Sequence, residues 1–374
     1  MIKAKNLIKI LEKNKINFFT GVPDSILKSL SSYLEKYSIK KHVIASNEGA
    51  AISIGIGYNL STNKIPCIYL QNSGLSNAIN PLISIASKDV YSIPLFLIIG
   101  WRGSPKKPDE PQHKAKGKIT LNLLKLLKID YCILRKENDL KKLKKLITKS
   151  KKNKSITAWL VEKDTLEPLK KREKNINRYI LRSYFIEKFL NLIPNKCKII
   201  STTGYTSREL MELRKKFNFN KGKDFYMVGG MGHSSSVGIG YALNSKKKVF
   251  CLDGDGSILM HLGALRTVGY LKNNNFKHII LNNNSHESVG GQLTNAAGID
   301  FKKFSDSIGY RNYYKIDRPK SIKKVIKKFI NSKGPSLLEV KIKTGSLKNL
   351  SRPENLLRIK EKFMVNWWAV YLLQ

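Results

Sequence analysis

A six-residue segment occurs twice in this chain, and the repeat constrains its fold more than any other feature. Residues 55–60 read Gly-Ile-Gly-Tyr-Asn-Leu, and residues 238–243, 183 positions later, read Gly-Ile-Gly-Tyr-Ala-Leu. Each copy is followed by a strand-like run that ends at a glycine, over 65–74 and 249–256. A single repeat with so long a period indicates two copies of one domain and not a solenoid of short units.

Short apolar runs alternate with helix-like patterns along the chain, which is typical of parallel sheets with helices on both faces. We expect strands near 16–20, 42–46, 65–71, 91–100, 198–202, 225–228, 248–253, 278–282 and 337–342. The sequence therefore predicts an α/β protein of two homologous, doubly wound parallel-sheet domains. We expect these domains at 1–165 and 179–345, joined by a charged stretch over 163–178 and followed by a C-terminal helical tail over 346–374.

The charge of the chain is strongly positive, with 69 Lys and Arg residues against 27 Asp and Glu residues and a formal net charge of +42. Such an excess ordinarily indicates a polyanion partner. Here the lysines recur from Lys3 to Lys362 without concentrating in one segment. No zinc-finger or RNP-type motif accompanies them, so we expect solvated surface charge and no nucleic-acid partner. A polyanion-binding protein is the non-enzyme alternative.

Cysteine spacing and hydropathy indicate the compartment. The four cysteines, at 67, 132, 197 and 251, lack CxxC spacing and lie in or beside apolar runs, so we expect them to be buried and reduced. No apolar stretch reaches the ~18–20 residues that a membrane span needs. The first fifteen residues lack a signal-peptide core. We therefore expect a cytoplasmic protein with no membrane partner.

The two copies of the repeat differ in where they carry acidic residues. Glu48 lies seven positions before the first copy, where the second half has Met231. Asp255 lies seventeen positions after the start of the second copy, close to where the first half has Ser73. One half thus has an acid at the start of a helix, and the other has an acid at the end of a strand. Contacts with opposite ends of one ligand would explain this asymmetry.

Polar residues follow two apolar strands of the second half. The run 249–252 leads into Asp253-Gly254-Asp255-Gly256, and the run 279–281 leads into Asn282-Asn283. Neighbouring strands lie ~4.8 Å apart and bind ligands at their carboxyl ends, so Asp255 and Asn283 can converge on one ion. A carboxylate, an amide oxygen and a carbonyl suit Mg²⁺ that keeps phosphate oxygens as its other ligands. The glycines let the backbone approach a phosphate.

This stretch resembles the thiamine-diphosphate-binding motif, in which Gly-Asp-Gly is followed by a spaced pair of asparagines. The resemblance implies that Mg²⁺ is bound by Asp255, Asn283 and the backbone carbonyl of Ser285. It also implies that the diphosphate lies against Gly254, Gly256, Ser257, Ser234 and Ser235.

The other end of thiamine diphosphate needs a carboxylate beside its aminopyrimidine ring. Glu48, within Ser-Asn-Glu-Gly-Ala-Ala at 46–51, resembles that glutamate. The turn Gly229-Gly230-Met231-Gly232 resembles the segment that binds the ring from the other domain. By that resemblance the Gly229 carbonyl accepts from the ring's amino group, and Met231 is the apolar wedge that keeps the cofactor bent.

Nearly the whole chain is similar to the phosphonopyruvate decarboxylases. The similar segments are 21–25, 71–75, 100–103, 109–113, 203–204, 207–210 and 282–292. The resemblance implies a thiamine-diphosphate-binding fold without a middle domain. It implies non-oxidative decarboxylation of 3-phosphonopyruvate to phosphonoacetaldehyde and CO₂, in phosphonate biosynthesis. Departures from the family pattern are Ser104, Lys106, Lys107, Asn284 where a glycine is commoner, and the tail residues Trp367 and Trp368.

By the same resemblance, Asp24 and His113 lie in loops that close over the cofactor and handle protons. A helix N-cap is the structural alternative for Asp24. The local cations for a phosphonate dianion are Arg102, Lys106 and Lys107, each of which could equally be a solvent-facing charge.

We expect a small anionic 2-oxo acid as substrate and a homo-oligomer with active sites at subunit interfaces. Sulfopyruvate decarboxylase is the nearest alternative, followed by another 2-oxo acid decarboxylase or a synthase.

Overall fold

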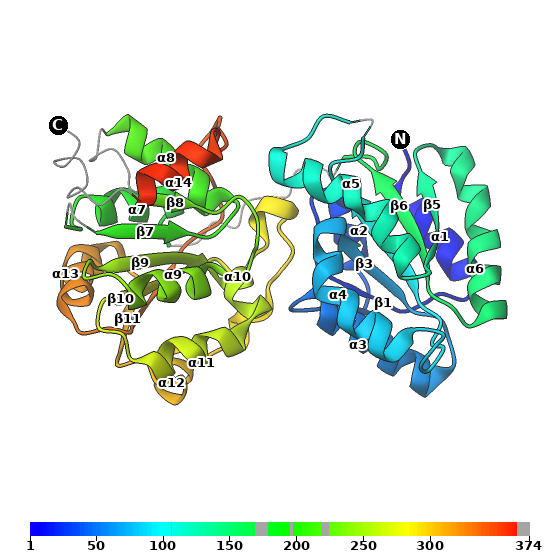
Figure 1. Cartoon of the computed structure of the whole chain (residues 1–374), viewed down its shortest axis with the longest axis horizontal. Coiled ribbons are helices and arrows are strands. Elements are labelled where there is room, and N and C mark those ends of the chain that lie inside the picture. The colour runs from blue at the N-terminus through cyan, green and yellow to red at the C-terminus, as the bar shows by residue number, and fades with distance from the viewer. Residues whose placement is uncertain (106, 169–178, 195–196, 218–223, 365–374) are drawn as a thin grey trace. The chain divides into compact units, whose positions relative to one another are not determined.

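The computed structural model describes all residues except 106, 169–178, 195–196, 218–223 and 365–374 (Figure 1). It divides into two compact units. Met1–Arg172 and the short segment His286–Leu293 form unit 1, and Glu173–Ser285 with Thr294–Gln374 form unit 2. Each unit is built on a single sheet of six parallel strands.

The sheet of unit 1 has the strand order β2-β1-β3-β4-β6-β5. Its strands are β1 (Phe19–Gly21), β2 (His42–Ile44), β3 (Cys67–Gln71), β4 (Phe96–Trp101), β5 (Asp130–Leu134) and β6 (Thr157–Glu162). The first four lie where the sequence predicts them, but β5 and β6 were not predicted. β6 is buried along its whole length, whereas β5 is a half-buried edge strand that begins with a charged residue.

The sheet of unit 2 has the order β11-β12-β10-β9-β7-β8. Its strands are β7 (Lys198–Ser201), β8 (Asp224–Tyr226), β9 (Val249–Gly254), β10 (Phe276–Asn282), β11 (Asn312–Ile316) and β12 (Ser336–Lys341). From the β8 edge this order is the one found in unit 1, strand for strand. The duplication and the doubly wound fold are therefore confirmed, although the edge strand β11 was not predicted.

Helices cover both faces of each sheet, as buried parallel strands require (Figure 1). Unit 1 contains α1 (Ala4–Lys13), α2 (Lys28–Leu34), α3 (Glu48–Thr62), α4 (Leu75–Pro81), α5 (Pro111–Leu126) and α6 (Lys141–Asn153). Alternate residues of β3 enter different cores. Cys67 and Tyr69 pack with α1, α2 and α6, while Ile68 and Leu70 pack with α3 and α4.

Unit 2 follows the same plan. Its helices are α7 (Arg182–Leu190), α8 (Tyr205–Lys216), α9 (Ser234–Leu243), α10 (Asp255–Met260), α11 (Leu262–Leu271), α12 (Phe301–Ile308), α13 (Ile322–Asn331) and α14 (Leu356–Met364). Phe250 and Leu252 of β9 pack with α7, α8 and α13, whereas Val249 and Cys251 pack with α9, α11 and α12.

The repeated Gly-Ile-Gly-Tyr segments lie at equivalent places, in α3 and α9. A Cβ on Gly55 would come within 2.9 Å of the Ile68 side chain, and a Cβ on Gly238 within 2.8 Å of Phe276. The first glycine of each copy therefore lets its helix pack closely on its sheet. The second glycines, Gly57 and Gly240, face open space.

Two further expectations concern the cysteines and the tail. All four cysteines are free, but Cys132 is only half-buried, because β5 is an edge strand. α14 is anchored where the ammonium of the buried Lys198 donates to the Phe363 carbonyl. Trp367 and Trp368 lie outside the described residues. Among the helices that the structure describes, none combines the length and apolarity needed to cross a bilayer.

Candidate active site

The predicted residues of unit 1 gather at the carboxyl edge of its sheet, where parallel α/β folds bind ligands. Asp24 follows β1, Glu48 follows β2, and Arg102 follows β4. Gln71, which ends β3, donates a hydrogen bond of 3.1 Å to the Asp24 carboxylate. The structure thus brings together side chains from four separate segments. Gln71 lies in a segment that the sequence analysis matched, but it was not selected as a site residue.

Glu48 is the first residue of α3 and is buried, with 6% of its surface exposed. Asn47 caps the helix by accepting a hydrogen bond of 2.8 Å from the Ala50 N–H. Asn77 of α4 donates to Glu48 Oε2 at 2.8 Å and fixes the direction of the carboxylate. A capped helix start and one side-chain donor thus hold this acid in place. Asn77 was not predicted, since a lone Asn in a helical pattern carries no signal.

Asp24 is almost fully buried, with 1% of its surface exposed. It accepts from the backbone N–H groups of Ile26 at 2.9 Å and Leu27 at 3.4 Å, so it caps the turn that leads into α2. Burial raises the pKa of the Asp24 carboxyl, although Gln71, these N–H groups and the charge of Arg102 act in the opposite direction. The residue is therefore both a structural cap and an acid that holds a proton more readily than usual.

His113 lies in the first turn of α5 and not in a loop, which corrects the sequence-based expectation. Pro111 begins this helix, and proline favours the first helical turn. Burial, helped by the charge of Arg102, lowers the pKa of the His113 imidazole to about 4. Its Nδ1 is buried with no hydrogen-bond partner in the described structure. At neutral pH the ring is therefore uncharged and can accept a proton.

The Arg102 guanidinium is held by two carboxylates. Its Nε donates to Asp109 Oδ2 at 2.7 Å, and its Nη2 contacts Asp109 Oδ1 at 2.5 Å and Glu110 Oε1 at 2.8 Å. Its Nη1 donates to Ser25 Oγ at 2.9 Å. Ligand atoms of Asp109, Glu110 and His113 lie within 4.8 Å of one another. Arg102 already pairs with both acids, so this cluster is an ion-pair network and a poor metal site.

The remaining predicted cations are less informative. Lys107 is exposed, and its Nζ lies 3.9 Å from Asp164 Oδ2. Lys106 lies outside the described residues. Ser104, a departure from the family pattern, is buried and donates to Glu162 Oε1 at 2.8 Å. Ser104 therefore ties the loop after β4 to the end of β6.

In unit 2, β9 and β10 are adjacent and parallel, with Gly254 opposite Leu281. Asp255 and Asn283 therefore leave the sheet at the same edge, as the sequence predicts. Asp255 begins α10 and accepts a hydrogen bond of 2.5 Å from Thr294 Oγ1. Asn283 Oδ1 accepts from the Ser285 N–H at 3.0 Å, which closes a tight turn after β10.

This edge has the donor set of a Mg²⁺ site. Burial raises the pKa of the Asp255 carboxyl to about 6, although Thr294 and the N–H groups of Asn283 and Gly256 favour the ion. A cation would remove that burial cost. Asn284 Oδ1 and Ser285 Oγ are buried without a hydrogen-bond partner in the described structure. Asp255, Asn283 and the Ser285 carbonyl fit a hard cation.

Asn284, which departs from the family pattern, has a backbone conformation that glycine usually supplies. Its φ is +54°, in the left-handed region that glycine adopts most easily. Asparagine is the side chain that tolerates this region best. The exchange of glycine for asparagine therefore preserves the turn that carries Asn283 and Ser285.

The predicted pyrimidine-binding turn contains two positive-φ glycines, Gly230 at +66° and Gly232 at +91°. A Cβ on Gly229 or Gly254 would meet nothing within 4 Å, so both backbones are open to an approaching group. Met231, between Gly230 and Gly232, is half-buried. The described side chains leave room here for a ligand, as a cofactor turn requires.

Ser234 is oriented differently from the prediction. Its hydroxyl donates to Asp253 Oδ2 at 2.6 Å, so its only O–H hydrogen is used inside the protein. Ser257 Oγ accepts from the Gly232 N–H at 3.0 Å and lies 3.0 Å from Thr202 Oγ1. Ser235 is buried in the first turn of α9.

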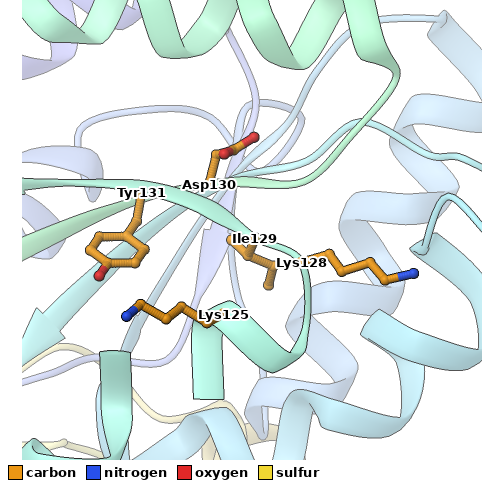
Figure 2. Close-up of a pocket in the computed structure, with 5 residues that line it drawn as sticks. All are labelled: Lys125, Lys128, Ile129, Asp130 and Tyr131. Atoms are coloured by element: carbon orange, nitrogen blue, oxygen red, sulfur yellow. The ribbon is translucent and has the colours of Figure 1, made fainter. Parts of the chain in front are cut away.

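Two surface pockets lie away from these residues. A pocket of about 420 Å³ is lined by Lys125, Lys128, Ile129, Asp130 and Tyr131, between the end of α5 and β5 (Figure 2). Its Lys128 pairs with exposed Asp89 at 3.0 Å, and the pair is solvated. A second pocket of about 380 Å³ lies between α8 and α14. Neither contains a predicted site residue.

One parallel α/β domain occurs twice, with an acid at a helix start in one copy and an Asp–Asn pair at strand ends in the other. This arrangement is that of a thiamine pyrophosphate enzyme. (Thiamine pyrophosphate is another name for thiamine diphosphate.) Family models agree. The N-terminal TPP binding domain of thiamine pyrophosphate enzymes matches residues 2–122, and the C-terminal TPP binding domain matches residues 203–340.

Relatives define the family within this class. The chain is 32% identical to a phosphonopyruvate decarboxylase of Streptomyces viridochromogenes, over 95% of this chain and 92% of that protein. It is 31% identical to one of Streptomyces hygroscopicus, over 95% and 91%. It is 26% identical to a sulfopyruvate decarboxylase of Methanosarcina acetivorans, over 91% and 92%. The chain belongs to the phosphonopyruvate decarboxylase family, and its class of enzyme is a thiamine-diphosphate-dependent decarboxylase.

Proposed function

We propose that this protein decarboxylates 3-phosphonopyruvate to phosphonoacetaldehyde and CO₂, using thiamine diphosphate and Mg²⁺, in phosphonate biosynthesis. The observation that carries the proposal is Asp255 beside Asn283 at one sheet edge, in a chain at least 31% identical over its length to two phosphonopyruvate decarboxylases. In this proposal residues 1–165 form the pyrimidine-binding domain and 179–345 bind diphosphate and metal; in the described part of the tail after residue 345, the helix is α14, Leu356–Met364.

The binding residues act at the two ends of the cofactor. Asp255, Asn283 and the Ser285 carbonyl hold Mg²⁺, and the turn with Gly254, Gly256 and Ser257 faces the diphosphate. Glu48 exchanges a proton with the aminopyrimidine ring, while the Gly229 carbonyl and Met231 hold that ring. When bound, thiamine diphosphate supplies a nucleophilic carbon that adds to the 2-oxo group and accepts the electrons released with CO₂.

Proton transfer at the carbon that loses CO₂ is the task of Asp24 and His113. Burial favours the protonated form of Asp24, so this residue can serve as the acid. His113 is neutral because burial and Arg102 lower its pKa, so it can take up the proton that the substrate oxygen loses when the aldehyde is released. Both residues lie in unit 1, which also holds Glu48.

In this proposal Arg102, with Lys106 and Lys107, binds the distal anion of the substrate. The ion pairs with Asp109 and Glu110 fix the direction of the Arg102 fork. An anion with two or three oxygens can compete with these carboxylates for the fork, whereas a neutral group cannot form the charge-assisted pair. Arg102 therefore favours a phosphonate over a neutral substituent.

Sulfopyruvate is the second candidate substrate, because a sulfopyruvate decarboxylase is similar over 91% of this chain. The test is to incubate purified protein with thiamine diphosphate, Mg²⁺ and either acid, and to follow CO₂ release and products by NMR. We expect kcat/KM for phosphonopyruvate to be at least ~10-fold higher, which corresponds to ~1.4 kcal/mol of transition-state binding. A preference for sulfopyruvate, or turnover of neither acid, would contradict the proposal.

We further propose that the protein is a homo-oligomer whose active sites lie at subunit interfaces. The support is the family resemblance, which implies that the domain of Glu48 (unit 1) and the domain of Asp255 (unit 2) meet across a subunit interface. A two-fold dimer would contain two such sites.

A further inference from the structure

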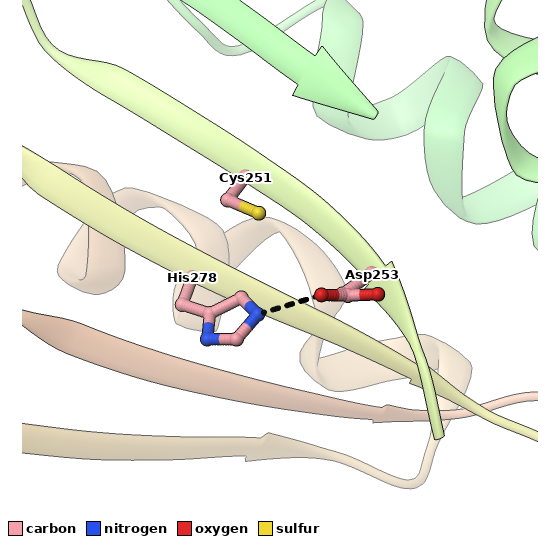
Figure 3. Close-up of side chains that lie close together, drawn as sticks. All are labelled: Cys251, Asp253 and His278. Carbon is pink, nitrogen blue, oxygen red and sulfur yellow. Dashed lines mark ion pairs between the residues drawn. The ribbon is translucent and has the colours of Figure 1, made fainter. Parts of the chain in front are cut away.

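A fully buried carboxylate lies directly behind the predicted diphosphate site. Asp253 of β9 has 1% of its surface exposed, and His278 of β10 has none (Figure 3). The His278 Nε2 atom lies 3.4 Å from Asp253 Oδ2. On the other side of the ring, His278 Nδ1 lies 3.0 Å from the Tyr310 hydroxyl. Three polar side chains thus form a chain inside an apolar core.

The proton positions along these three side chains follow from the acceptor at one end, the Asp253 carboxylate. Burial favours a neutral Asp253, but contacts from His278, Ser234 and Ser257 hold the pKa of its carboxyl below the usual range. In the tautomer with its hydrogen on Nε2, His278 points that N–H toward Asp253 Oδ2 at 3.4 Å, and its Nδ1 accepts from the Tyr310 hydroxyl at 3.0 Å. Burial raises the pKa of the Tyr310 hydroxyl well above its usual value, so this residue keeps its proton and donates it.

These residues do not form a second metal centre, although atoms of Cys251, Asp253 and His278 lie within 4.8 Å of one another (Figure 3). Both Asp253 oxygens already accept hydrogen bonds, Oδ2 from Ser234 at 2.6 Å and Oδ1 from the Gly254 N–H at 3.0 Å. Burial raises the pKa of the Cys251 thiol well above its usual value, so no thiolate is present.

Asp253 instead holds the segments around the predicted diphosphate site. Ser234, its partner, is the first residue of α9, and Gly254 is the last residue of β9. Ser257 of α10 connects Asp253 to the turn at 229–233, because its Oγ accepts from the Gly232 N–H at 3.0 Å. Gly232 leaves no room for a side chain, since a Cβ there would lie 2.6 Å from the His261 ring.

We propose that Asp253, supported by His278 and Tyr310, is a positioning residue that sets the diphosphate-binding backbone. The hydroxyls of Ser234 and Ser257 transmit that position and do not donate to the diphosphate. The donors are instead backbone N–H groups at the start of α9, which have no intrahelical acceptor. This inference rests on the proposed thiamine diphosphate site.

The test compares Asp253→Asn, His278→Gln and Tyr310→Phe with Ile280→Ala. Ile280 lies two residues after His278 on β10, is equally buried, and belongs to the apolar core and not to the polar chain. Calorimetric titration with thiamine diphosphate at saturating Mg²⁺ measures cofactor affinity, and thermal unfolding measures stability. Removing a supporting partner of a ligand site typically costs ~10–100-fold in affinity.

We expect Asp253→Asn to weaken cofactor binding by ~10–100-fold, His278→Gln by less, and Tyr310→Phe by least. Ile280→Ala should lower the unfolding temperature and leave the affinity unchanged. If Asp253→Asn does not fold, the graded losses in the other two variants carry the test. Normal affinity in folded His278→Gln and Tyr310→Phe, or an equal loss in Ile280→Ala, would overturn the inference. Failure of the unmodified protein to bind thiamine diphosphate would instead contradict the proposed function.

Discussion

The Glu48 carboxylate occupies the space that a side chain on Gly74 would need. A Cβ on Gly74 would lie 2.1 Å from Glu48 Oε1. The Gly74 backbone, with φ −82° and ψ −8°, is open to any residue, so the requirement for glycine is steric. The glycine after β3 and the acid at the start of α3 therefore depend on one another, although 26 positions separate them.

Gly74→Ala should displace Glu48 and reduce turnover by ~10²-fold, since an error of about 1 Å in a reacting group can cost that much. Gly57→Ala is the matched control in the same helix as Glu48. An added Cβ there meets nothing within 4 Å, and removing a helical glycine stabilises by ~0.5–1 kcal/mol. Steady-state kinetics and thermal unfolding separate the two effects. Equal activity in both variants would show that Glu48 tolerates displacement.

Mg²⁺ affinity should depend on the proton at Asp255. Its pKa is raised to about 6, so the proton competes with the metal below that pH. We expect apparent Mg²⁺ affinity to fall ~10-fold per pH unit below pH ~6. A pH series of calorimetric titrations measures this slope. An affinity that does not change between pH 5 and 7 would remove Asp255 from the metal site.

Asp255→Asn is the control for the same residue. A raised carboxyl pKa means that the metal-free fold loses stability as pH rises from ~4 towards ~6, because the folded state holds the proton more tightly than the unfolded state. The Asn variant should lack this loss. It should also bind Mg²⁺ and thiamine diphosphate much more weakly at every pH, and excess Mg²⁺ should not restore cofactor affinity.

His113 should remain neutral throughout the physiological pH range. Burial and Arg102 lower its pKa to about 4, compared with an ordinary value near 6.5. Nitrogen-detected NMR of the imidazole, assigned with His113→Gln, measures the midpoint. Arg102→Met should shift that midpoint upward, because it removes a nearby positive charge. A midpoint near 6.5 in the unmodified protein would contradict the assignment of His113 as a neutral proton acceptor.

The subunit arrangement can be tested by mixing two inactive variants. Glu48→Gln and Asp255→Ala are unfolded together in equal amounts and refolded. If each site takes Glu48 from one chain and Asp255 from another, about half the dimers are mixed and half of their sites are intact. We expect about a quarter of wild-type activity to return. Activity that stays at the level of either variant alone would place both residues of a site on one chain.

Sequence patterns predicted the parts of this protein that local chemistry specifies. The repeat predicted two equivalent sheets, and the runs before Asp255 and Asn283 predicted a shared sheet edge. The edge strands β5 and β11 were missed because most of their residues are only half-buried, so their apolar pattern is weak. His113 was placed in a loop by the family resemblance, whereas α5 begins two residues earlier, at Pro111.

Side chains that support a site residue only through tertiary contacts could not be predicted from the sequence. Asn77 supports Glu48 from another helix, and Thr294 contacts Asp255 across 39 positions. Ser234 was predicted to donate to the diphosphate, whereas its hydroxyl donates to Asp253. Nothing in the residue type distinguishes these two roles. Such roles depend on which side chains the fold brings to the same point.

Proton–deuterium exchange at C2 of bound thiamine diphosphate tests directly whether Glu48 activates a cofactor that Asp255 anchors. The amide of Glu48→Gln cannot protonate the pyrimidine ring. We predict that this variant binds the cofactor normally but exchanges the C2 proton ~10²–10⁴-fold more slowly, in parallel with its loss of turnover. Exchange at the wild-type rate in an inactive Glu48→Gln variant would contradict the account.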